Sequence, residues 1–373
     1  MESNKHRIWA EIDLDAIEHN YRVICTQSRA PVLCVVKADA YGHGAAPVAA
    51  RLQAIGAPYF AVATVPEAIE LRDSGITKPI LLLGYVDEAD METVARQHIT
   101  ASVYDRETAR LLSAAAVRTG EQITVHYKVD TGMTRLGFAA WQHEQTVRDI
   151  LDCAALPGLC SEGIFTHFAI SDVPAGREYT EMQYARFAAV CNSLHQAGLN
   201  LTLRHCANSG GIQFYESMHC TMTRAGIILY GYRPDDSAPP LLDLRPAMTV
   251  KARVVQVREI PAHTTVSYGR TYETEAPTRI AVVAIGYADG YLRTGSGRAQ
   301  MVLAGHTVPV LGRVCMDMCM VGLPEGAAVH RGDVATVFGP AGWTAEDVAR
   351  AAGTISYEVV CAVSSRVPRF YIG

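Results

Sequence analysis

The sequence lacks the features that mark membrane, secreted and nucleic-acid-binding proteins. No apolar run approaches the ~18 residues that a membrane-spanning helix requires. The opening residues, Met-Glu-Ser-Asn-Lys-His-Arg, contain no apolar signal region. Lysine and arginine form no basic run or stripe, and the formal net charge is −5. We therefore expect a cytoplasmic protein, with no membrane and no nucleic acid among its partners.

Paired cysteines of the kind that bind metals are missing too. The ten cysteines include no C-x-x-C pair. Cys315 and Cys319 lie four residues apart, but no histidine or cysteine cluster completes a zinc site around them. We predict no metal site, and we expect most cysteines to be reduced and buried as small hydrophobic residues.

What the chain does contain is a regular alternation of short apolar runs and helix-like segments. Its 373 residues are too many for one ordinary domain, and 49% of them are hydrophobic. Eight strand candidates occur at 32–37, 58–63, 79–83, 98–103, 123–129, 160–166, 201–206 and 226–230. This alternation predicts an α/β fold, a (β/α)8 TIM-type barrel. An open doubly wound sheet is the alternative, but the units are too many and no G-x-G-x-x-G follows the first strand.

The pattern changes after a proline-rich connection at residues 233–240. Strand candidates follow at 248–258, 265–268, 280–285, 300–304, 307–311 and 334–338, with a final pair at 355–363 and 366–372. One helix is expected at 344–352, where Thr344 and Asp347 resemble a capping box. We predict a barrel domain at residues 1–233 and a mainly β C-terminal domain at 234–373. An early strand at 8–14 could instead pack with the second domain.

Lys37 stands where the first barrel strand is expected to end. Residues 32–36 are apolar, and Gly42 and Gly44 then let the chain turn toward a helix. A lysine desolvated at the mouth of a barrel has a depressed pKa and can carry a Schiff base. The alternative is that Lys37 only ends the strand and extends its ammonium group into water.

Other reactive side chains follow the same rule, because functional groups of a barrel gather at the C-terminal ends of its strands. The later strand ends carry Lys128, Arg135, His167, the turn Asn208 to Gly211, and Arg224. Each of these features by itself is weak evidence for a functional site, since a histidine is usually a core residue and Asn-Ser-Gly-Gly is usually a turn. Their coincidence suggests pyridoxal 5'-phosphate, held by a reactive lysine and a phosphate cradle.

Six motifs resemble those of the alanine racemase family, and the resemblance spans nearly the whole chain, from Trp9 to Tyr371. They are Val35-Val-Lys-Ala-Asp-Ala-Tyr-Gly-His-Gly44, His126-Tyr-Lys-Val-Asp-Thr-Gly-Met-Thr-Arg-Leu-Gly137, Val266-Ser-Tyr-Gly-Arg-Thr-Tyr272, Ile285-Gly-Tyr-Ala-Asp-Gly290, Gly312-Arg-Val-Cys-Met-Asp317 and Ile355-Ser-Tyr-Glu358. The resemblance implies a pyridoxal phosphate barrel of fold-type III, followed by a β domain, in a head-to-tail homodimer with shared active sites. The catalytic domains of serine/alanine racemases are related.

The resemblance implies that Lys37 holds the cofactor and acts as the base on one face of the substrate carbon. Tyr268 resembles the base on the opposite face, supplied by the other subunit. Racemisation needs both bases, because a proton leaves one face and returns on the other. The usual pKa of tyrosine is about 10, so its phenolate needs a stabilising donor. The family's arrangement would place His167 beside Tyr268 and Arg224 beyond it.

Further roles follow by motif position. Arg224 resembles the arginine that faces the pyridine nitrogen, and Lys128 resembles a lysine that can be carbamylated beside Arg135. Arg135 and the backbone N–H of Met316 match the substrate-carboxylate contacts. The positions that bind the cofactor phosphate in the family are matched here by Tyr41, Ser209, Gly226, Ile227 and Tyr357, and Asn208 adjoins them. Cys315 and Asp317 would shape the site from the second domain. The residues that match the substrate entrance are Tyr287, Asp172, Arg293 and Arg313.

The function predicted is that of an alanine racemase, an isomerase that supplies D-alanine for peptidoglycan. A serine or dual serine/alanine racemase is the close alternative. The resemblance implies that Tyr357 favours alanine, because some serine/alanine racemases have an asparagine at this position, which opens room for a hydroxymethyl group. Met318 and Gly322 depart from the usual family pattern beside the site. A pyridoxal phosphate homeostasis protein without catalysis would resemble the barrel alone. A decarboxylase would lack the motifs of the second domain.

Overall fold

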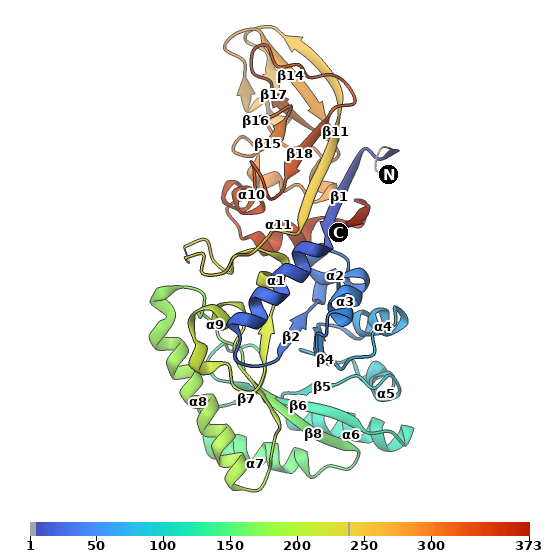
Figure 1. Ribbon diagram of the computed structural model, residues 1–373, viewed down its shortest axis with the longest axis vertical. Coiled ribbons are helices and arrows are strands. Elements are labelled where there is room, and N and C mark those ends of the chain that lie inside the picture. The colour runs from blue at the N-terminus through green and yellow to red at the C-terminus, as the bar shows by residue number, and fades with distance from the viewer. Residues whose placement is uncertain (1–4, 238) are drawn as a thin grey trace.

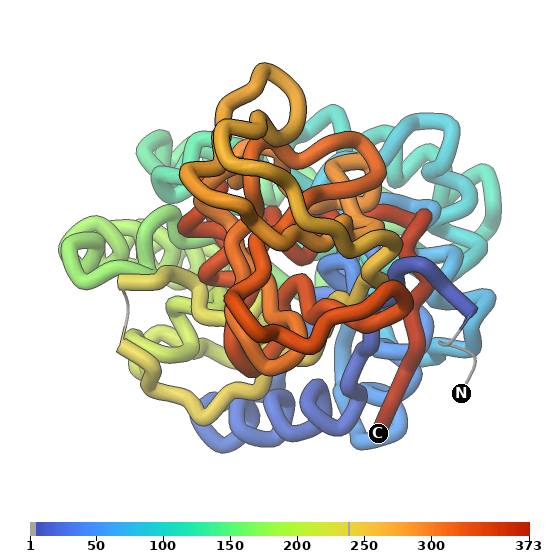
Figure 2. Tube along the Cα trace, turned by 90° about the horizontal axis from the view of Figure 1, so that it is seen from above, coloured from blue at the N-terminus to red at the C-terminus, as the bar shows by residue number. Residues whose placement is uncertain are grey.

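The computed structural model describes residues 5–237 and 239–373. Figure 1 shows two stacked parts, an α/β barrel below and a β-rich domain above, and Figure 2 shows the second domain lying over the ring of the barrel. Within the described residues, no helix combines the length and the apolar character needed to cross a membrane.

Eight parallel strands form the predicted barrel, which confirms the fold class. They are β2 (Val32–Val35), β3 (Tyr59–Val62), β4 (Ile80–Leu82), β5 (Ala101–Val103), β6 (Ile123–Asp130), β8 (Leu159–Phe165), β9 (Leu203–His205) and β10 (Thr223–Ala225). Pairing runs in the orders β10-β2-β3-β4 and β5-β6-β8-β9. Backbone hydrogen bonds join these two sheets on both sides, from Leu82 N to Thr100 O (2.9 Å) and from Arg224 N to Ala207 O (2.9 Å).

Helices cover the outside of the barrel (Figure 1). They are α1 (Leu14–Gln27), α3 (Ala45–Ala54), α4 (Val65–Asp73), α5 (Met91–Arg96), α6 (Arg106–Thr119), α7 (His143–Ala154), α8 (Arg177–Gln196) and α9 (Ser209–Phe214). Local signals explain several boundaries: Thr64 and Glu67 form a capping box at the start of α4, and Gly120 ends α6 in the left-handed region. All four residues of β2 are buried, as expected for a strand enclosed on both faces.

The last barrel strand lies earlier than predicted. The prediction of a strand at 226–230 is wrong, because β10 is Thr223–Ala225 and Ile227–Tyr230 forms a 3₁₀ helix. Gly226, with φ −105° and ψ −112°, interrupts the strand. The apolar run after it is buried on all sides, so its composition fits a strand and a helical turn equally well.

The second domain is built on an eight-stranded sheet. Its strands are β1 (Ile8–Asp13), β11 (Met248–Ile260), β14 (Thr278–Val283), β15 (Gln300–Leu303), β16 (His306–Leu311), β17 (Cys319–Gly322), β18 (Val334–Phe338) and β19 (Arg369–Ile372). Their order is β14-β17-β16-β15-β18-β11-β1-β19, and β11 also pairs with β14, so the sheet curls into a small closed barrel. Although β1 begins the chain, it pairs antiparallel with β11 and parallel with β19.

Small elements complete this domain: the hairpin of β12 (Thr265–Val266) and β13 (Tyr272–Glu273), and the helices α10 (Ala345–Ala352) and α11 (Ser356–Ala362). Thr344 and Asp347 form the expected capping box of α10. The prediction of a strand at 355–363 is wrong, because this segment contains α11. Its buried residues Ser356, Val359, Val360 and Val363 recur with helical spacing and pack toward the barrel, so tertiary contacts override the β-branched composition.

Candidate active site

A cavity of about 520 Å³ opens at the C-terminal ends of the barrel strands. Every residue that the family motifs assign to the cofactor lines it, as do one predicted entrance residue and the predicted carboxylate-binding arginine, whereas Gly210 and Gly211 of the predicted phosphate turn do not. The lining includes Lys37, Tyr41, Lys128, Arg135, His167, Asp172, Asn208, Ser209, Arg224, Gly226, Ile227 and Tyr357. Tyr357 comes from α11 of the second domain, and its ring centroid lies 6.1 Å from that of Tyr41. Both domains therefore build the cavity.

Lys37 begins a turn of unusual hand, α2 (Lys37–Gly42). Four consecutive residues, Ala38 to Tyr41, have φ between 51° and 54°, which is the left-handed helical region. Such a conformation costs roughly 1–2 kcal/mol for each non-glycine residue. Carboxylates hold the turn at both ends: Glu67 accepts from Ala38 N at 2.7 Å, and Asp39 accepts from Ala45 N at 2.7 Å. The left-handed turn lets Lys37 and Tyr41 line the same cavity.

The cavity is strongly cationic. Burial is the main cause that lowers the pKa of Lys37, and the positive charge of Arg135 adds to it. Burial, Arg224 and Arg135 lower the pKa of Lys128 to about 7. The Lys128 ammonium lies 4.7 Å from the centroid of the Phe165 ring. Both lysines therefore have a larger neutral fraction at neutral pH than a lysine in water.

Arg224 is buried and held by neutral groups. Its guanidinium donates to the carbonyl oxygens of Thr166 (2.8 Å), His205 (2.9 Å) and Cys206 (3.2 Å), and to the Nδ1 atoms of His205 (3.0 Å) and His167 (3.2 Å). Burial lowers its pKa only to about 10, so it stays protonated at neutral pH. The arginine is thus a fixed cation with one orientation.

Because a guanidinium only donates, it determines the tautomers of its neighbours. His167 accepts at Nδ1, so its proton is on Nε2, and burial and the charge of Arg224 lower its pKa well below the usual range. His205 accepts from Arg224 and its Nε2 lies 2.9 Å from Nδ1 of His126, whose Nε2 lies 2.8 Å from the Glu162 carboxylate. The result is a directed chain of hydrogen bonds from Arg224 to Glu162.

The sequence did not predict this series of hydrogen bonds from Arg224 to Glu162, nor the position of Phe165 beside it. Phe165 stacks on His205 with centroids 4.9 Å apart, and its ring also faces Lys128 and Arg224. A signal was present, because Phe165 and His205 end β8 and β9 and so occupy the same strand-end positions as the predicted site residues.

A small polar cradle lies beside Arg224. The Ser209 Oγ accepts from Gly226 N at 3.2 Å, and Asn208 caps α9 by accepting from Gly211 N at 3.0 Å. A Cβ added to Gly226 would lie 2.9 Å from the Tyr41 hydroxyl and 3.5 Å from Ser209 Oγ. Glycine therefore keeps open the space between two hydroxyl groups and a backbone N–H.

The predicted residues of the second domain, Tyr357 excepted, lie away from this cavity. None of Tyr268, Tyr287, Arg293, Arg313, Cys315, Met316 or Asp317 is part of its lining. Tyr268 is 69% exposed and Met316 is 52% exposed. Strand β12 ends before Tyr268 because Ser267 has φ 68°, and Ser267 Oγ donates to Arg313 O at 2.6 Å. Within one chain, therefore, Lys37 and Tyr268 belong to separate surfaces.

Known proteins resemble this chain over nearly its whole length. The family model of the alanine racemase N-terminal domain matches residues 12–234, and that of the alanine racemase C-terminal domain matches residues 247–371. An alanine racemase of Desulfovibrio desulfuricans is 45% identical over 98% of each chain, and one of Desulforamulus reducens is 44% identical over 99% of this chain and 100% of the relative. A solved alanine racemase of Clostridium difficile 630 superimposes with a TM-score of 0.94 at 39% identity, covering 98% of this chain and 96% of the other. A solved complex of the same enzyme with cycloserine gives a TM-score of 0.91 at 38% identity, over the same shares.

Proposed function

The chain belongs to the alanine racemase family, and on that premise we propose that it interconverts L- and D-alanine with pyridoxal 5'-phosphate as cofactor. The observation that carries the proposal is the cavity in which Lys37, Arg224 and the Tyr41–Ser209 cradle meet. We further propose that the enzyme is a cytoplasmic homodimer, and that its D-alanine supplies peptidoglycan synthesis.

The residues of the cavity fit this cofactor. An aldehyde requires a nearby amine of lowered pKa, which Lys37 provides. A phosphate group requires hydroxyl and backbone N–H donors around an open space, as between Tyr41, Ser209 and Gly226. The fixed cation Arg224 would face the pyridine nitrogen. Bound pyridoxal phosphate would supply the electron sink that makes the α-proton of an amino acid acidic.

Two bases on opposite faces are needed for racemisation, and the proposal assigns them to Lys37 and to Tyr268 of a second subunit. Lys37 is inside the cavity, whereas Tyr268 is exposed on the second domain and free to enter another chain's cavity. The Nε2–H of His167, left as a donor by Arg224, could stabilise a tyrosine phenolate that approaches it. A dimer with shared sites would thus complete the catalytic set.

Substrate binding would use the remaining cations. Arg135 lines the cavity and would bind the substrate carboxylate, and Met316 of the partner would add a backbone N–H. Lys128, with a pKa of about 7, is partly neutral at neutral pH and can add carbon dioxide with loss of one proton. The carbamate would place a negative charge near Arg135, where a plain ammonium group would repel it.

The reaction is tested by α-proton exchange. Protein loaded with pyridoxal phosphate is incubated in D2O with L-alanine or L-serine, and NMR and a D-isomer assay follow the reaction. Loss of the α-proton signal together with D-alanine formation, and little change with serine, is expected, since Tyr357 lines the cavity. Equal or faster turnover of serine would favour a serine/alanine racemase. Absence of exchange with both would refute catalysis.

Shared sites are tested by subunit mixing. Lys37→Ala and Tyr268→Phe homodimers should both lose most of their activity, and mixing them should raise activity above that of either, because one site of each hybrid contains both native bases. Subunit exchange is measured independently with two affinity tags. Hybrids that form but remain inactive would disprove the shared site.

A further inference from the structure

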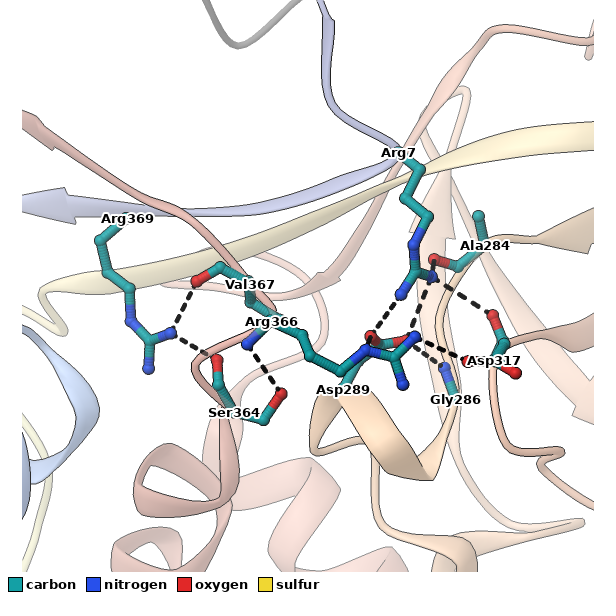
Figure 3. Close-up of polar contacts among 9 residues, drawn as sticks. All are labelled: Arg7, Ala284, Gly286, Asp289, Asp317, Ser364, Arg366, Val367 and Arg369. Carbon is teal, nitrogen blue, oxygen red and sulfur yellow. Dashed lines mark hydrogen bonds and ion pairs between the residues drawn. The ribbon is translucent and has the colours of Figure 1, made fainter.

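Asp289 is the buried centre of an ionic cluster in the second domain, whose other side chains, Arg7, Asp317 and Arg366, are 39–48% exposed (Figure 3). We use the name Asp289 cluster for Arg7, Asp289, Asp317 and Arg366. The Asp289 side chain is fully buried, and its carboxylate contacts Arg7 at 2.5 Å and Arg366 at 3.6 Å and accepts from Gly286 N at 3.1 Å. Arg366 also contacts the Asp317 carboxylate at 2.7 Å. Two cations and two anions therefore balance within the cluster.

The cluster joins segments that are far apart in the sequence. Arg7 precedes β1 and also donates to Ala284 O at 2.9 Å, at the end of β14. Asp289 belongs to the turn 286–290, Asp317 to the turn 312–317, and Arg366 to the segment before β19. Figure 3 shows Arg7 and Arg366 reaching the carboxylate of Asp289 from these different segments. Removing the central carboxylate would leave two arginines facing each other.

Two exposed side chains are carried by the turns that the cluster holds. Tyr287 N donates to Cys315 O and Ala288 N donates to Met316 O, each at 3.0 Å, so the turns are bonded to each other. A Cβ on Gly286 would collide with both carbonyl groups, so glycine permits this close approach. Tyr287 is 42% exposed and Met316 is 52% exposed. The backbone is thus fixed from inside while both side chains face outward.

The same cluster is connected to the cofactor turn of its own chain. Arg369 donates to Gly42 O of α2 at 3.1 Å and to the carbonyl oxygens of Val363, Ser364 and Val367, each at 2.6 Å. Ser364 N in turn donates to Asp289 O at 3.1 Å. A short series of hydrogen bonds therefore runs from the turn that presents Lys37 to the backbone carbonyl of Asp289, and the Asp289 carboxylate takes no part in it.

We propose that Asp289 is a positioning residue, which holds the Tyr287 and Met316 turns in the arrangement that completes the partner's active site. The inference rests on the proposed shared site. It assigns to Asp289 an effect on catalysis in the neighbouring cavity, not in the cavity of its own chain. A purely structural ion pair would instead stabilise only the chain that carries it. Its loss would then lower activity equally, whether that chain contributes Lys37 or Tyr268 to the competent site.

Subunit mixing separates these two roles. In a hybrid of Lys37→Ala and Tyr268→Phe chains, the one competent site uses Lys37 of the second chain and the Tyr268, Tyr287 and Met316 surface of the first. Asp289→Asn is placed either in the Lys37→Ala chain or in the Tyr268→Phe chain. Both hybrids then contain the same three substitutions. We expect kcat/KM to fall roughly 100-fold in the first placement and to stay within about twofold of the parent hybrid in the second.

Two further variants serve as checks. Arg366→Lys keeps the charge but not the guanidinium geometry, and it is placed in the same two ways in case Asp289→Asn weakens folding. Glu11→Gln is the matched control, because its ion pair with Lys251 (2.7 Å) also joins β1 to β11 but touches none of the catalytic turns. It should give equal activities in both placements.

The outcomes are distinct. If the parent hybrid is inactive although exchange occurs, the shared site itself is wrong, and this inference fails with it. If the parent hybrid is active and both placements of Asp289→Asn and of Arg366→Lys give equal activities, the positioning role alone is overturned. A larger loss of activity with either variant in the Lys37→Ala chain supports the positioning role, and a larger loss in the Tyr268→Phe chain overturns it.

Discussion

The barrel and the second domain offer two different kinds of surface to the proposed reaction. In the barrel, Lys37, Lys128 and Arg224 share a cavity in which burial and mutual repulsion alter their pKa values. In the second domain, Tyr268 and Met316 are exposed, and fixed backbone turns support them. The barrel thus shifts the pKa values of its side chains by desolvation, whereas the second domain presents exposed side chains whose proposed part in the reaction requires a second chain.

The largest effect is expected at Lys37. Lys37→Ala should lower kcat/KM by roughly 10⁴-fold or more, because the variant loses both the attachment group and one base. Borohydride trapping and mass spectrometry should find no covalent cofactor in this variant and full attachment in Tyr268→Phe. Equal covalent attachment of the cofactor in Lys37→Ala and Tyr268→Phe would show that Lys37 is not the attachment residue.

Tyr268→Phe should lower racemisation by about 10²–10⁴-fold, since one of two bases is lost. One enantiomer should still exchange its α-proton in D2O without inversion, because Lys37 continues to act on one face. The ratio of exchange to inversion, measured separately from L- and D-alanine, reports this. Symmetric loss of exchange from both enantiomers would contradict separate bases.

A smaller effect is expected behind the cavity. His205→Leu removes an acceptor of Arg224 and interrupts the chain to Glu162, and a lost hydrogen bond to a buried charge corresponds to roughly 10–100-fold in kcat/KM. The exposed His195, changed to leucine, is the control. Unchanged activity of His205→Leu would show that the carbonyl groups around Arg224 suffice to orient it.

The smallest change concerns stability and its pH dependence. The pKa of Lys128 is about 7 in the folded chain against 10.5 for the ordinary group. Between these values the unfolded chain binds more protons, so the free energy of unfolding should rise with pH, by a few kcal/mol at most. Lys128→Met should reduce this slope in urea unfolding between pH 7 and 10 in buffer free of carbon dioxide, whereas Lys78→Met should not. Equal slopes would show that Lys128 is not desolvated.

Much of the fold could be predicted because local and global preferences agree. The run Val32–Val35 is apolar and fully enclosed, and the Thr64 capping box starts a helix as expected. Prediction failed at 226–230 and 355–363, where apolar runs suit a strand or a helix equally well. In the first segment Gly226 ends the strand, and in the second the packing of α11 against the barrel stabilises a helix.

The candidate site shows the same division. Lys37, His167, Ser209 and Arg224 could be predicted to meet, because barrel topology brings strand ends together. His126, His205 and Phe165 escaped notice, because a buried histidine or phenylalanine has the sequence pattern of an ordinary core residue. Asp289 escaped a specific role as well, since its partners Arg7 and Arg366 are 282 and 77 positions away.

The sequence by itself determined the alternation of strands and helices in the first domain, the barrel, and the rim on which the predicted site residues lie, since these depend on short periodic patterns and on topology. Only the tertiary structure decided the left-handed turn of α2, the tautomers along the histidine chain, the exposure of Tyr268 and the Asp289 cluster. These features arise from contacts between distant segments. Their energies depend on burial and on the distance between charges, which no local pattern contains.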